Sequence, residues 1–404
     1  MKSVAPRAVP LTFYSVAEPV PGQGWQNLFR SAWPAYRQWY LRDGAAAATG
    51  LGPGGVAGSG LALGGVAGSG LALGGVAGSE LALCEQMLAA HMPELVPTWQ
   101  RLVALADGDP LAAQMLTLYN PPPFLAGCSQ AVYLGSEPAL VRNYDYAPEL
   151  LERVVFGSAF TGRRVVGMSD CLWGLVDGMN DAGLAVSLAF GGRLAMGPGF
   201  GIPLVLRYVL EVCDTAAQAR LALARLPVHM AYNVTVADRA GDYFTVFVSP
   251  DSEPVFLDSP IATNLEPEPG SPTTAPHSRE RQALLASLVR QPGLTLDDLV
   301  SRFLEPPLHS DAYDQGFGTL YTAVYRPADL SVEYRWRDSS WQHSIGSFAS
   351  GQHDVVLASR DAVGPAAAGP GDTPPPRGQA PGPRGPGTPR WPKGPVTSSR
   401  SLGR

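Results

Sequence analysis

A Gly-Cys step at positions 127 and 128 begins the segment that most constrains the fold of this chain. It opens an apolar β-like run, and a second such run, residues 139–146, follows a turn rich in Gly, Ser and Pro. Two β-like runs joined by a short turn predict an antiparallel hairpin. The Cys128 thiol would stand at the start of one strand, with Arg142 and Asp145 near the end of the other. A cysteine nucleophile needs such neighbours, because a free thiol is mostly protonated at neutral pH.

These residues resemble a known family. A Gly-Cys step followed by Arg-Asn-x-Asp-x at residues 142–146 is similar to the acyl-coenzyme A:6-aminopenicillanic acid acyltransferase family, peptidase family C45. That family belongs to the N-terminal-nucleophile hydrolases, together with the choloylglycine hydrolases. Its members cut their own backbone before a cysteine, which then supplies a thiol and an α-amine. The resemblance covers roughly residues 85–345 and is strongest at 125–150 and 171–192.

Composition limits the partners and sites to be expected. The chain has 404 residues and a net charge of −6, which gives no electrostatic reason to expect nucleic acid. Its four cysteines are widely spaced and form no C-x-x-C, so neither a disulfide framework nor a zinc site is expected. No apolar core of signal-peptide length follows the first residues. We therefore predict a reduced, cytoplasmic protein with no membrane association, no metal ion and no organic cofactor.

Composition also divides the chain into regions. Residues 1–127 are predicted to form a helical N-terminal region, with helices at about 25–42 and within 85–120. Three ten-residue copies of a Gly-rich repeat predict a low-complexity insertion at 45–83, and a structured or membrane element is the less favoured alternative. Residues 359–404 are rich in Pro and Gly and nearly lack large apolar side chains, so we predict a disordered tail.

The region 128–358 is predicted to be the catalytic domain. The expected elements are hairpins at residues 171–190 and 230–248, helices at 203–225 and 278–290, and strands at 319–325 and 331–336. Helices clustered between hairpins predict an α+β layered domain. The family resemblance implies a more specific fold, a four-layer αββα sandwich in which two antiparallel sheets lie between helical layers.

Cys128 is the predicted nucleophile, with an inert buried cysteine as the alternative. A stiff Pro run at residues 121–123 and the uncrowded backbone of Gly127 suit a cleavage site before it. After the self-cleavage that the resemblance implies, the α-amine of Cys128 would be the general base. Its reference pKa of about 7.7–8.0 allows it to take the thiol proton near neutral pH.

The partner strand supplies the predicted neighbours of the thiol. Asp145 is expected to accept hydrogen bonds from the α-amine or the thiol, and Arg142 to lower the thiol pKa or hold a substrate carboxylate. A salt bridge between these two residues is the alternative, although residues three apart on a strand face opposite sides. Asn143 and Tyr144 lie between them and are predicted substrate contacts.

The resemblance implies two further site residues. Asn264 follows a β-like stretch and would donate to the oxyanion, with a turn-forming role or Asn233 as alternatives. Arg281 would contact the substrate as in relatives, with a solvated helix position as the alternative, and Ser278 is the predicted N-cap of that helix. One position departs from the pattern: choloylglycine hydrolases carry an Asn after the Met-Asn-x-x-Gly turn, where this chain has Ala189.

These features predict a self-processing cysteine amidohydrolase or acyltransferase, made as a zymogen and activated by autocatalytic cleavage. Its substrate would be a small-molecule linear amide or acyl thioester, and its own N-terminal fragment would be a partner after cleavage. The alternative is an inactive relative that serves as a binding or scaffold module. A third, weaker possibility is a processed protein that acts as a protease only on itself.

Overall fold

The computed structural model describes residues 8–48, 77–123, 126–275 and 277–359. Most of the predicted Gly-rich insertion at 45–83 and nearly all of the predicted tail at 359–404 lie outside the described residues. Among the described residues, no helix combines the length and apolarity that crossing a membrane requires.

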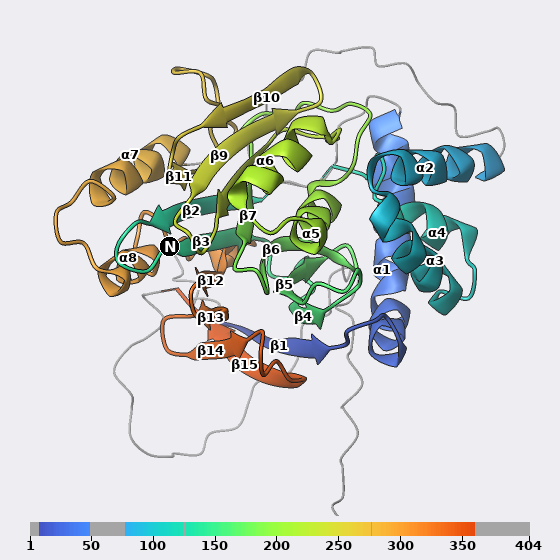
Figure 1. Ribbon diagram of the computed structural model, residues 1–404, viewed down its shortest axis with the longest axis horizontal. Coiled ribbons are helices and arrows are strands. Elements are labelled where there is room, and N and C mark those ends of the chain that lie inside the picture. The colour runs from blue at the N-terminus through green and yellow to red at the C-terminus, as the bar shows by residue number, and fades with distance from the viewer. Residues whose placement is uncertain (1–7, 49–76, 124–125, 276, 360–404) are drawn as a thin grey trace, which may run out of the picture.

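Two β-sheets form the centre of the molecule (Figure 1). The larger sheet contains β1 (Val9–Ala17), β4 (Val154–Ser158), β5 (Val165–Asp170), β6 (Gly174–Asn180), β7 (Ala185–Phe190), β8 (Tyr232–Ala237), β9 (Tyr243–Ser249), β10 (Ser252–Leu257) and β15 (Gly351–Leu357). The smaller sheet contains β2 (Gly127–Tyr133), β3 (Ala139–Tyr146), β11 (Ile261–Ala262), β12 (Gly318–Arg326), β13 (Ser331–Arg335) and β14 (Ser340–Ser344). Their strand orders are β10-β9-β8-β7-β6-β5-β4-β1-β15 and β11-β2-β3-β12-β13-β14. β1 and β4 are parallel, whereas the other neighbours are antiparallel.

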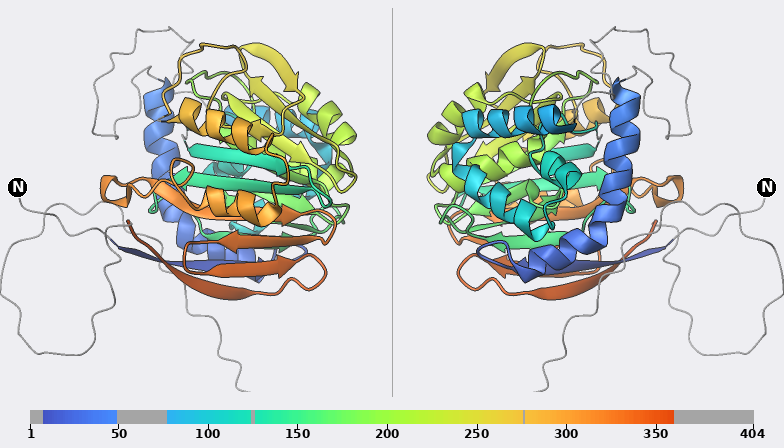
Figure 2. Two further views of the ribbon diagram at one scale, coloured as in Figure 1. Left: turned by 90° about the vertical axis from the view of Figure 1, so that its left-hand side faces the viewer. Right: turned by 90° about the vertical axis from the view of Figure 1, so that its right-hand side faces the viewer.

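Helices cover the outer faces of both sheets. α5 (Ile202–Val212) and α6 (Ala216–Arg225) pack on the larger sheet, and α7 (Ser278–Leu288) and α8 (Leu296–Phe303) pack on the smaller one. The inner faces meet where β2 and β3 lie against β7 and β8. Figure 2 shows α7 and α8 in orange on one side of the sheets and a further helical group on the other. The expected α+β architecture with two packed sheets is thus confirmed.

The further helical group comes from the N-terminal part of the chain. It contains α1 (Gln23–Ala48), α2 (Ala77–His91), α3 (Val96–Leu105) and α4 (Pro110–Leu116), with the 3-10 turn η1 (Pro93–Leu95) between α2 and α3. The helix predicted at 25–42 is confirmed, and the helical region predicted within 85–120 is interrupted near Pro93. Asp109 caps α4 by accepting hydrogen bonds from the backbone N–H groups of Leu111 and Ala112.

The N-terminal region is not wholly helical, which corrects the prediction for residues 1–127. β1 pairs with β4 on one side and with β15 on the other. Leu11, Phe13 and Ser15 are buried at every second position, whereas their neighbours are more exposed. This two-residue period is the signature of a strand with one buried face. The larger sheet is therefore built from chain segments on both sides of the Gly127–Cys128 peptide bond.

The hairpins and central helices agree with the sequence prediction, but one helix cap differs. β2 and β3, β6 and β7, and β8 and β9 form the three predicted hairpins. The N-cap of α7 is His277, at a φ of 54°, rather than Ser278. The Ser278 hydroxyl instead donates to the carbonyl oxygen of Ala275, so the predicted cap is wrong.

Candidate active site

Cys128 is the second residue of β2 and is fully buried between the two sheets. In the β2–β3 ladder it lies opposite Tyr144, so the two side chains share one face of the hairpin. Nη2 of Arg142 lies 3.1 Å from the Cys128 Sγ and donates to it. Burial raises the pKa of the Cys128 thiol, and the Arg142 guanidinium opposes this increase. In the uncut chain the thiol is therefore protonated at neutral pH.

Arg142 is held by a carboxylate of the larger sheet. Its Nη1 donates to Oδ2 of Asp177 in β6 at 2.6 Å and to the carbonyl oxygen of Val176. Both side chains of this ion pair are completely buried. The alternative of an Arg142–Asp145 salt bridge is therefore wrong, because the carboxylate partner is Asp177. The sequence analysis missed Asp177, although a carboxylate within an otherwise apolar strand signals a paired buried charge.

Asp145 lies on the opposite face of the hairpin from the thiol. It is opposite Gly127 in the ladder, and Thr319 Oγ1 donates to its Oδ1 at 2.7 Å. Nη1 of Arg281 lies 3.9 Å from its Oδ2. Burial raises the pKa of the Asp145 carboxyl, and the charge of Arg281 is the largest opposing influence. Asp145 and the Cys128 thiol therefore lie on different faces of the hairpin.

Gly127 is required by close packing. A Cβ at this position would lie 3.0 Å from Cζ of Phe317 and 3.1 Å from Cβ of Asp145. Gly127 is not among the residues with a positive φ. The need for glycine therefore comes from the approach of neighbouring side chains and not from a left-handed backbone.

Asn264 and Arg281 hold the backbone of Cys128. Oδ1 of Asn264 accepts a hydrogen bond from the backbone N–H of Cys128 at 3.1 Å. Arg281 donates to the carbonyl oxygen of Cys128, and also to Oγ of Ser129 at 2.7 Å and Oδ1 of Asn264 at 2.9 Å. Both side chains are buried, so the alternative of a solvated helix position for Arg281 is wrong. A turn-forming role does not describe Asn264, whose side chain contacts the predicted nucleophile.

The side-chain amide of Asn264 contacts the backbone on both sides of the predicted cleavage point. Its Nδ2 donates to the carbonyl oxygen of Ala126 at 3.3 Å and to that of Phe190 at 2.9 Å. Asn233, the alternative to Asn264, instead donates to the carbonyl oxygens of Thr263 and Leu265. Asn233 therefore supports the segment that carries Asn264 and does not face the thiol itself.

The two predicted substrate contacts of β3 are placed differently. Nδ2 of Asn143 donates to the carbonyl oxygens of Phe303 and Leu308, and Thr322 Oγ1 donates to its Oδ1. Asn143 therefore faces α8 and lies outside the group around the thiol. Tyr144 is completely buried, and the Arg142 guanidinium lies 4.7 Å from its ring centroid. The structure brings Tyr144, but not Asn143, to the thiol.

A second buried polar cluster joins α1 to the loop between β5 and β6. Tyr36 Oη donates to Glu152 and lies 3.1 Å from Oδ1 of Asp170. Burial, with the charge of Glu152 as the next cause, raises the pKa of Asp170 to about 7. Cys171 and Leu172 follow with φ values of 56° and 73°. We call Tyr36, Glu152 and Asp170 the carboxyl cluster; the sequence analysis did not predict it.

The segment before the predicted cleavage point packs against the loop 191–201. The backbone N–H of Asn120 donates to the carbonyl oxygen of Gly199, and Asn120 Oδ1 accepts from the Gly199 N–H, both at 2.8 Å. The ring centroids of Tyr119 and Phe200 are 5.2 Å apart. In the uncut chain, the residues just before the Pro run therefore lie against this loop.

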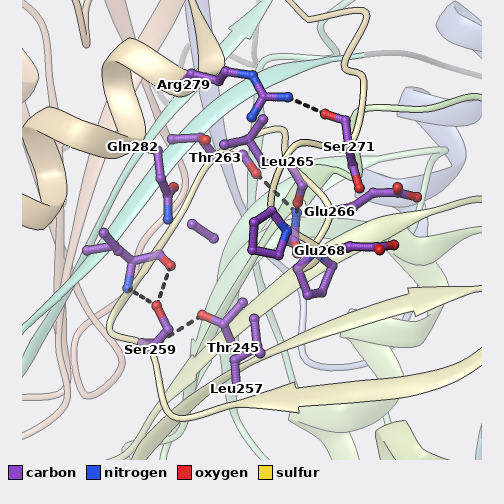
Figure 3. Close-up of a pocket in the computed structure, with 15 residues that line it drawn as sticks. Thr245, Leu257, Ser259, Thr263, Leu265, Glu266, Glu268, Ser271, Arg279 and Gln282 are labelled. Atoms are coloured by element: carbon purple, nitrogen blue, oxygen red, sulfur yellow. Dashed lines mark hydrogen bonds between the residues drawn. The ribbon is translucent and has the colours of Figure 1, made fainter.

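A cavity of about 240 Å³ lies behind the segment that carries Asn264 (Figure 3). Thr263 and Leu265 line it, whereas Cys128 and Asn264 do not. Residues from the segment 266–271 contribute to its wall. The cavity is thus separated from the thiol by the backbone around Asn264. Among the described residues, no three His, Cys, Asp or Glu side chains are grouped so that they could hold a metal ion.

Comparisons with known proteins place the chain in a family. Residues 134–341 match the model of the family described as acyl-coenzyme A:6-aminopenicillanic acid acyl-transferase. No curated protein matches the chain. The resemblance seen in the sequence is confirmed by the family model, which covers more than half of the chain.

Similar solved structures share little sequence with the chain. A conjugated bile acid hydrolase from Clostridium perfringens is 10% identical, covers 56% of this chain and 96% of its own, and has a TM-score of 0.40. Penicillin V acylase from Agrobacterium tumefaciens is 15% identical, the match covers 56% of this chain and 90% of the acylase, and the TM-score is 0.38. An ortholog of N-acylethanolamine-hydrolyzing acid amidase from Caenorhabditis elegans is 16% identical, the match covers 53% of this chain and 99% of the ortholog, and the TM-score is 0.37. On the strength of the family model, the chain belongs to the acyl-coenzyme A:6-aminopenicillanic acid acyl-transferase family.

Proposed function

We propose that this chain is a self-processing cysteine amidohydrolase or acyltransferase with Cys128 as its N-terminal nucleophile. The observation that carries the proposal is the 3.1 Å contact between the Arg142 guanidinium and the Cys128 thiol, at a peptide bond held by Asn264. A cation beside a thiol favours the thiolate, which is the attacking form. Family membership supports a small-molecule linear amide or acyl thioester as the substrate.

The first reaction would be cleavage of the chain itself. Sγ of Cys128 attacks the carbonyl carbon of Gly127, the C–N bond breaks, and the Cys128 nitrogen leaves as an amine with the thiol proton. Water then hydrolyses the Gly127 thioester and restores the thiol. Oδ1 of Asn264 accepts from the Cys128 nitrogen in the uncut chain and would hold the α-amine afterwards.

Turnover would use the same groups. The α-amine takes the thiol proton, Sγ attacks the substrate carbonyl, and the amine or thiol leaving group departs with a proton. Water or an acceptor amine then releases the acyl group from Cys128. After the cut, Ala126 belongs to the N-terminal fragment, so Nδ2 of Asn264 is free to release its hydrogen bond to the Ala126 carbonyl oxygen. That N–H could then donate to the substrate oxyanion.

The division of the chain would follow the cut. Residues 128–358 would form the catalytic chain, 1–127 would be the propeptide, and 359–404 would be a disordered tail. Contacts of β1 and α1 with elements after Cys128 support the propeptide as a lasting partner. Trp25 donates to the carbonyl oxygen of Leu172, and Tyr36 donates to Glu152.

The test is the intact mass of the purified protein under denaturing conditions, with N-terminal sequencing of each fragment. Wild type should give two chains, the larger one beginning Cys-Ser-Gln-Ala-Val. Cys128→Ala should give a single uncut chain without turnover of fluorogenic acyl amides. Cys213→Ala is the matched control, because Cys213 is also buried but lies at the C-cap of α5. Turnover by Cys128→Ala would reject the proposal.

An inactive binding module is the second candidate, and one observation favours it. Ala189 stands where the choloylglycine hydrolases carry an Asn, so one expected donor to the oxyanion is missing. Labelling with iodoacetamide separates the two functions. An enzyme should show Cys128 alkylated faster than Cys171 and Cys213, whereas a module should show no difference. Cleavage without turnover of any acyl amide would instead indicate a protein that acts only on itself.

A further inference from the structure

Tyr144 carries a buried hydroxyl that has no hydrogen-bond partner within the described part of the chain. The whole residue is inaccessible to solvent. Leaving a buried hydroxyl unpaired costs folding free energy, so folded proteins nearly always pair such groups. An unpaired hydroxyl on the residue that lies opposite a candidate nucleophile suggests that its partner is a group that arrives with the substrate.

The ring of Tyr144 lies close to the thiol. Tyr144 lies directly opposite Cys128 in the β2–β3 ladder, on the face that looks toward the larger sheet. The Arg142 guanidinium contacts both, through Nη2 to Sγ at 3.1 Å and through its carbon at 4.7 Å from the Tyr144 ring centroid. The rings of Tyr146 and Tyr321 each have centroids 5.7 Å away. The Tyr144 ring is therefore held on several sides.

The hydroxyl is also a donor under all physiological conditions. Burial, with the charge of Asp170 as the next cause, raises the pKa of Tyr144 well above its usual value. The acidic Cys128 thiol is among the neighbours that contribute to this increase. Tyr144 therefore keeps its proton while a thiolate forms on the residue opposite it in the ladder.

Nε of Arg142 is also unpaired among the described residues, whereas Ser187, Gln130 and Asn233 have partners. Ser187 donates to the side-chain oxygen of Gln130, whose amide nitrogen lies 3.4 Å from the carbonyl oxygen of Asn233. The Asn233 amide donates to the segment around Asn264. Ala189, in β7, has no polar group to offer. The amide of Asn264 is then one donor for an oxyanion, and a second donor is needed from another element.

We propose that the Tyr144 hydroxyl donates a hydrogen bond to the oxyanion formed when Cys128 attacks its substrate, in the role left open at Ala189. The proposal rests on the proposed function. During attack the Sγ–C bond forms and the carbonyl π pair moves to oxygen, while the Tyr144 proton stays on Tyr144. When the intermediate collapses, the C–N bond breaks and the leaving nitrogen takes its proton from the α-ammonium group of Cys128.

The test is Tyr144→Phe, which removes only the hydroxyl. We expect kcat for fluorogenic acyl-aminocoumarin amides to fall roughly 100-fold, as for other single oxyanion donors, with an unchanged KM. The concentration of active enzyme is set by thiol titration of Cys128. Thermal unfolding should stay at the wild-type temperature or rise, because an unpaired buried polar group has been removed. An unchanged kcat, or a raised KM with unchanged kcat, would overturn the proposal.

Tyr208→Phe is the matched control. Arg225 donates to the Tyr208 hydroxyl, and this pair links α5 to α6 away from the thiol. Its removal should lower the unfolding temperature and leave kcat unchanged, which is the reverse of the result expected for Tyr144→Phe. A purely structural Tyr144 would behave like Tyr208, and that result would also overturn the proposal.

A second readout uses the acyl aldehyde that matches the best amide substrate. The aldehyde forms a hemithioacetal with Cys128, and the new C–O group occupies the position of the oxyanion. Tyr144→Phe should weaken aldehyde inhibition at least tenfold while KM for the amide stays constant, and unchanged inhibition would contradict the role. If Tyr144→Phe does not cleave its own chain, an unfolding temperature equal to that of wild type supports a role of Tyr144 at the oxyanion of the cleavage reaction. A lower unfolding temperature overturns the proposal. Wild type without cleavage or turnover would instead reject the proposed function.

Discussion

Asp177 holds Arg142 where its guanidinium reaches the Cys128 thiol. Beyond the ion pair, Tyr321 donates to Oδ2 of Asp177 at 2.6 Å and Tyr325 donates to Oδ1. The buried carboxylate is therefore matched by one guanidinium and two hydroxyl groups. Such full pairing is what makes a buried charge tolerable, since neither partner can be solvated by water. Asp177 acts through Arg142 and is a positioning residue.

Asp177→Asn should lower the free energy of unfolding by about 3 kcal/mol, because it leaves the Arg142 charge buried without a counter-ion. Denaturant unfolding in the Cys128→Ala background, in which the chain stays in one piece, measures this change. Asp251→Asn is the control, because Asp251 pairs with Arg193 at 2.7 Å but is 53% exposed. It should cost less than about 1 kcal/mol. Equal losses in the two variants would show that Arg142 is not held as described.

The site residues differ in how far the sequence could predict them. Cys128, Arg142 and Asp145 come from one hairpin, so their proximity follows from local pairing alone. Asn264 and Arg281 reach Cys128 from more than a hundred residues away and could be named only through the family resemblance. Asn143 was misplaced, although alternation along β3 already puts it on the face opposite Arg142.

The loop between β5 and β6 is held by α1 through the carboxyl cluster. Its residues Cys171 and Leu172 have positive φ values, which are unfavourable for side chains with a Cβ. The backbone N–H of Leu172 donates to Glu152 at 2.6 Å, and that of Cys171 donates to Oδ1 of Asp170 at 2.7 Å. The loop conformation therefore depends on two buried carboxyl groups and on Tyr36.

The cluster should make stability depend on pH. The pKa of Asp170 is about 7 in the folded chain, against about 3.9 in an unfolded one. The folded state therefore binds more protons than the unfolded state between these values, and the free energy of unfolding falls as pH rises through this window. Asp170→Asn should flatten the decrease. Denaturant unfolding at several pH values in the Cys128→Ala background measures it, and an identical slope in both proteins would contradict the assigned pKa.

At the level of elements, the prediction was best where the pattern is local. The hairpins and the helices at 203–225 have clear periods, and Thr215 caps α6 by accepting a hydrogen bond from the Gln218 N–H. β1, β4, β5, β10, β14 and β15 were not predicted. β1 is stabilised by pairing with distant chain, as shown by the 2.6 Å hydrogen bond from Thr12 to Asp354, 342 residues away. A short window of sequence does not contain that partner.

The molecule as a whole is continuous across the predicted cut. β1 separates β4 from β15 in the larger sheet, so its removal would leave two strand edges without partners. Phe13 of β1 is completely buried, with its ring centroid 4.9 Å from that of Trp336. Cutting the chain before Cys128 breaks none of these contacts. The fragment that carries β1 should therefore remain an integral part of the processed protein.

Two chains that separate under denaturing conditions should consequently elute together in native size-exclusion chromatography. Phe13→Ala should cause part or all of the N-terminal fragment to dissociate and elute separately. The reason is that truncating a buried Phe lowers the free energy of unfolding by about 3–5 kcal/mol. Thr12→Ala is the control, since Thr12 is on the less buried face of the same strand and loses only its bond to Asp354. Its fragment should stay bound. Elution of the wild-type fragment on its own would contradict this prediction. It would show that β1 dissociates after cleavage and that β4 and β15 are left without the strand between them.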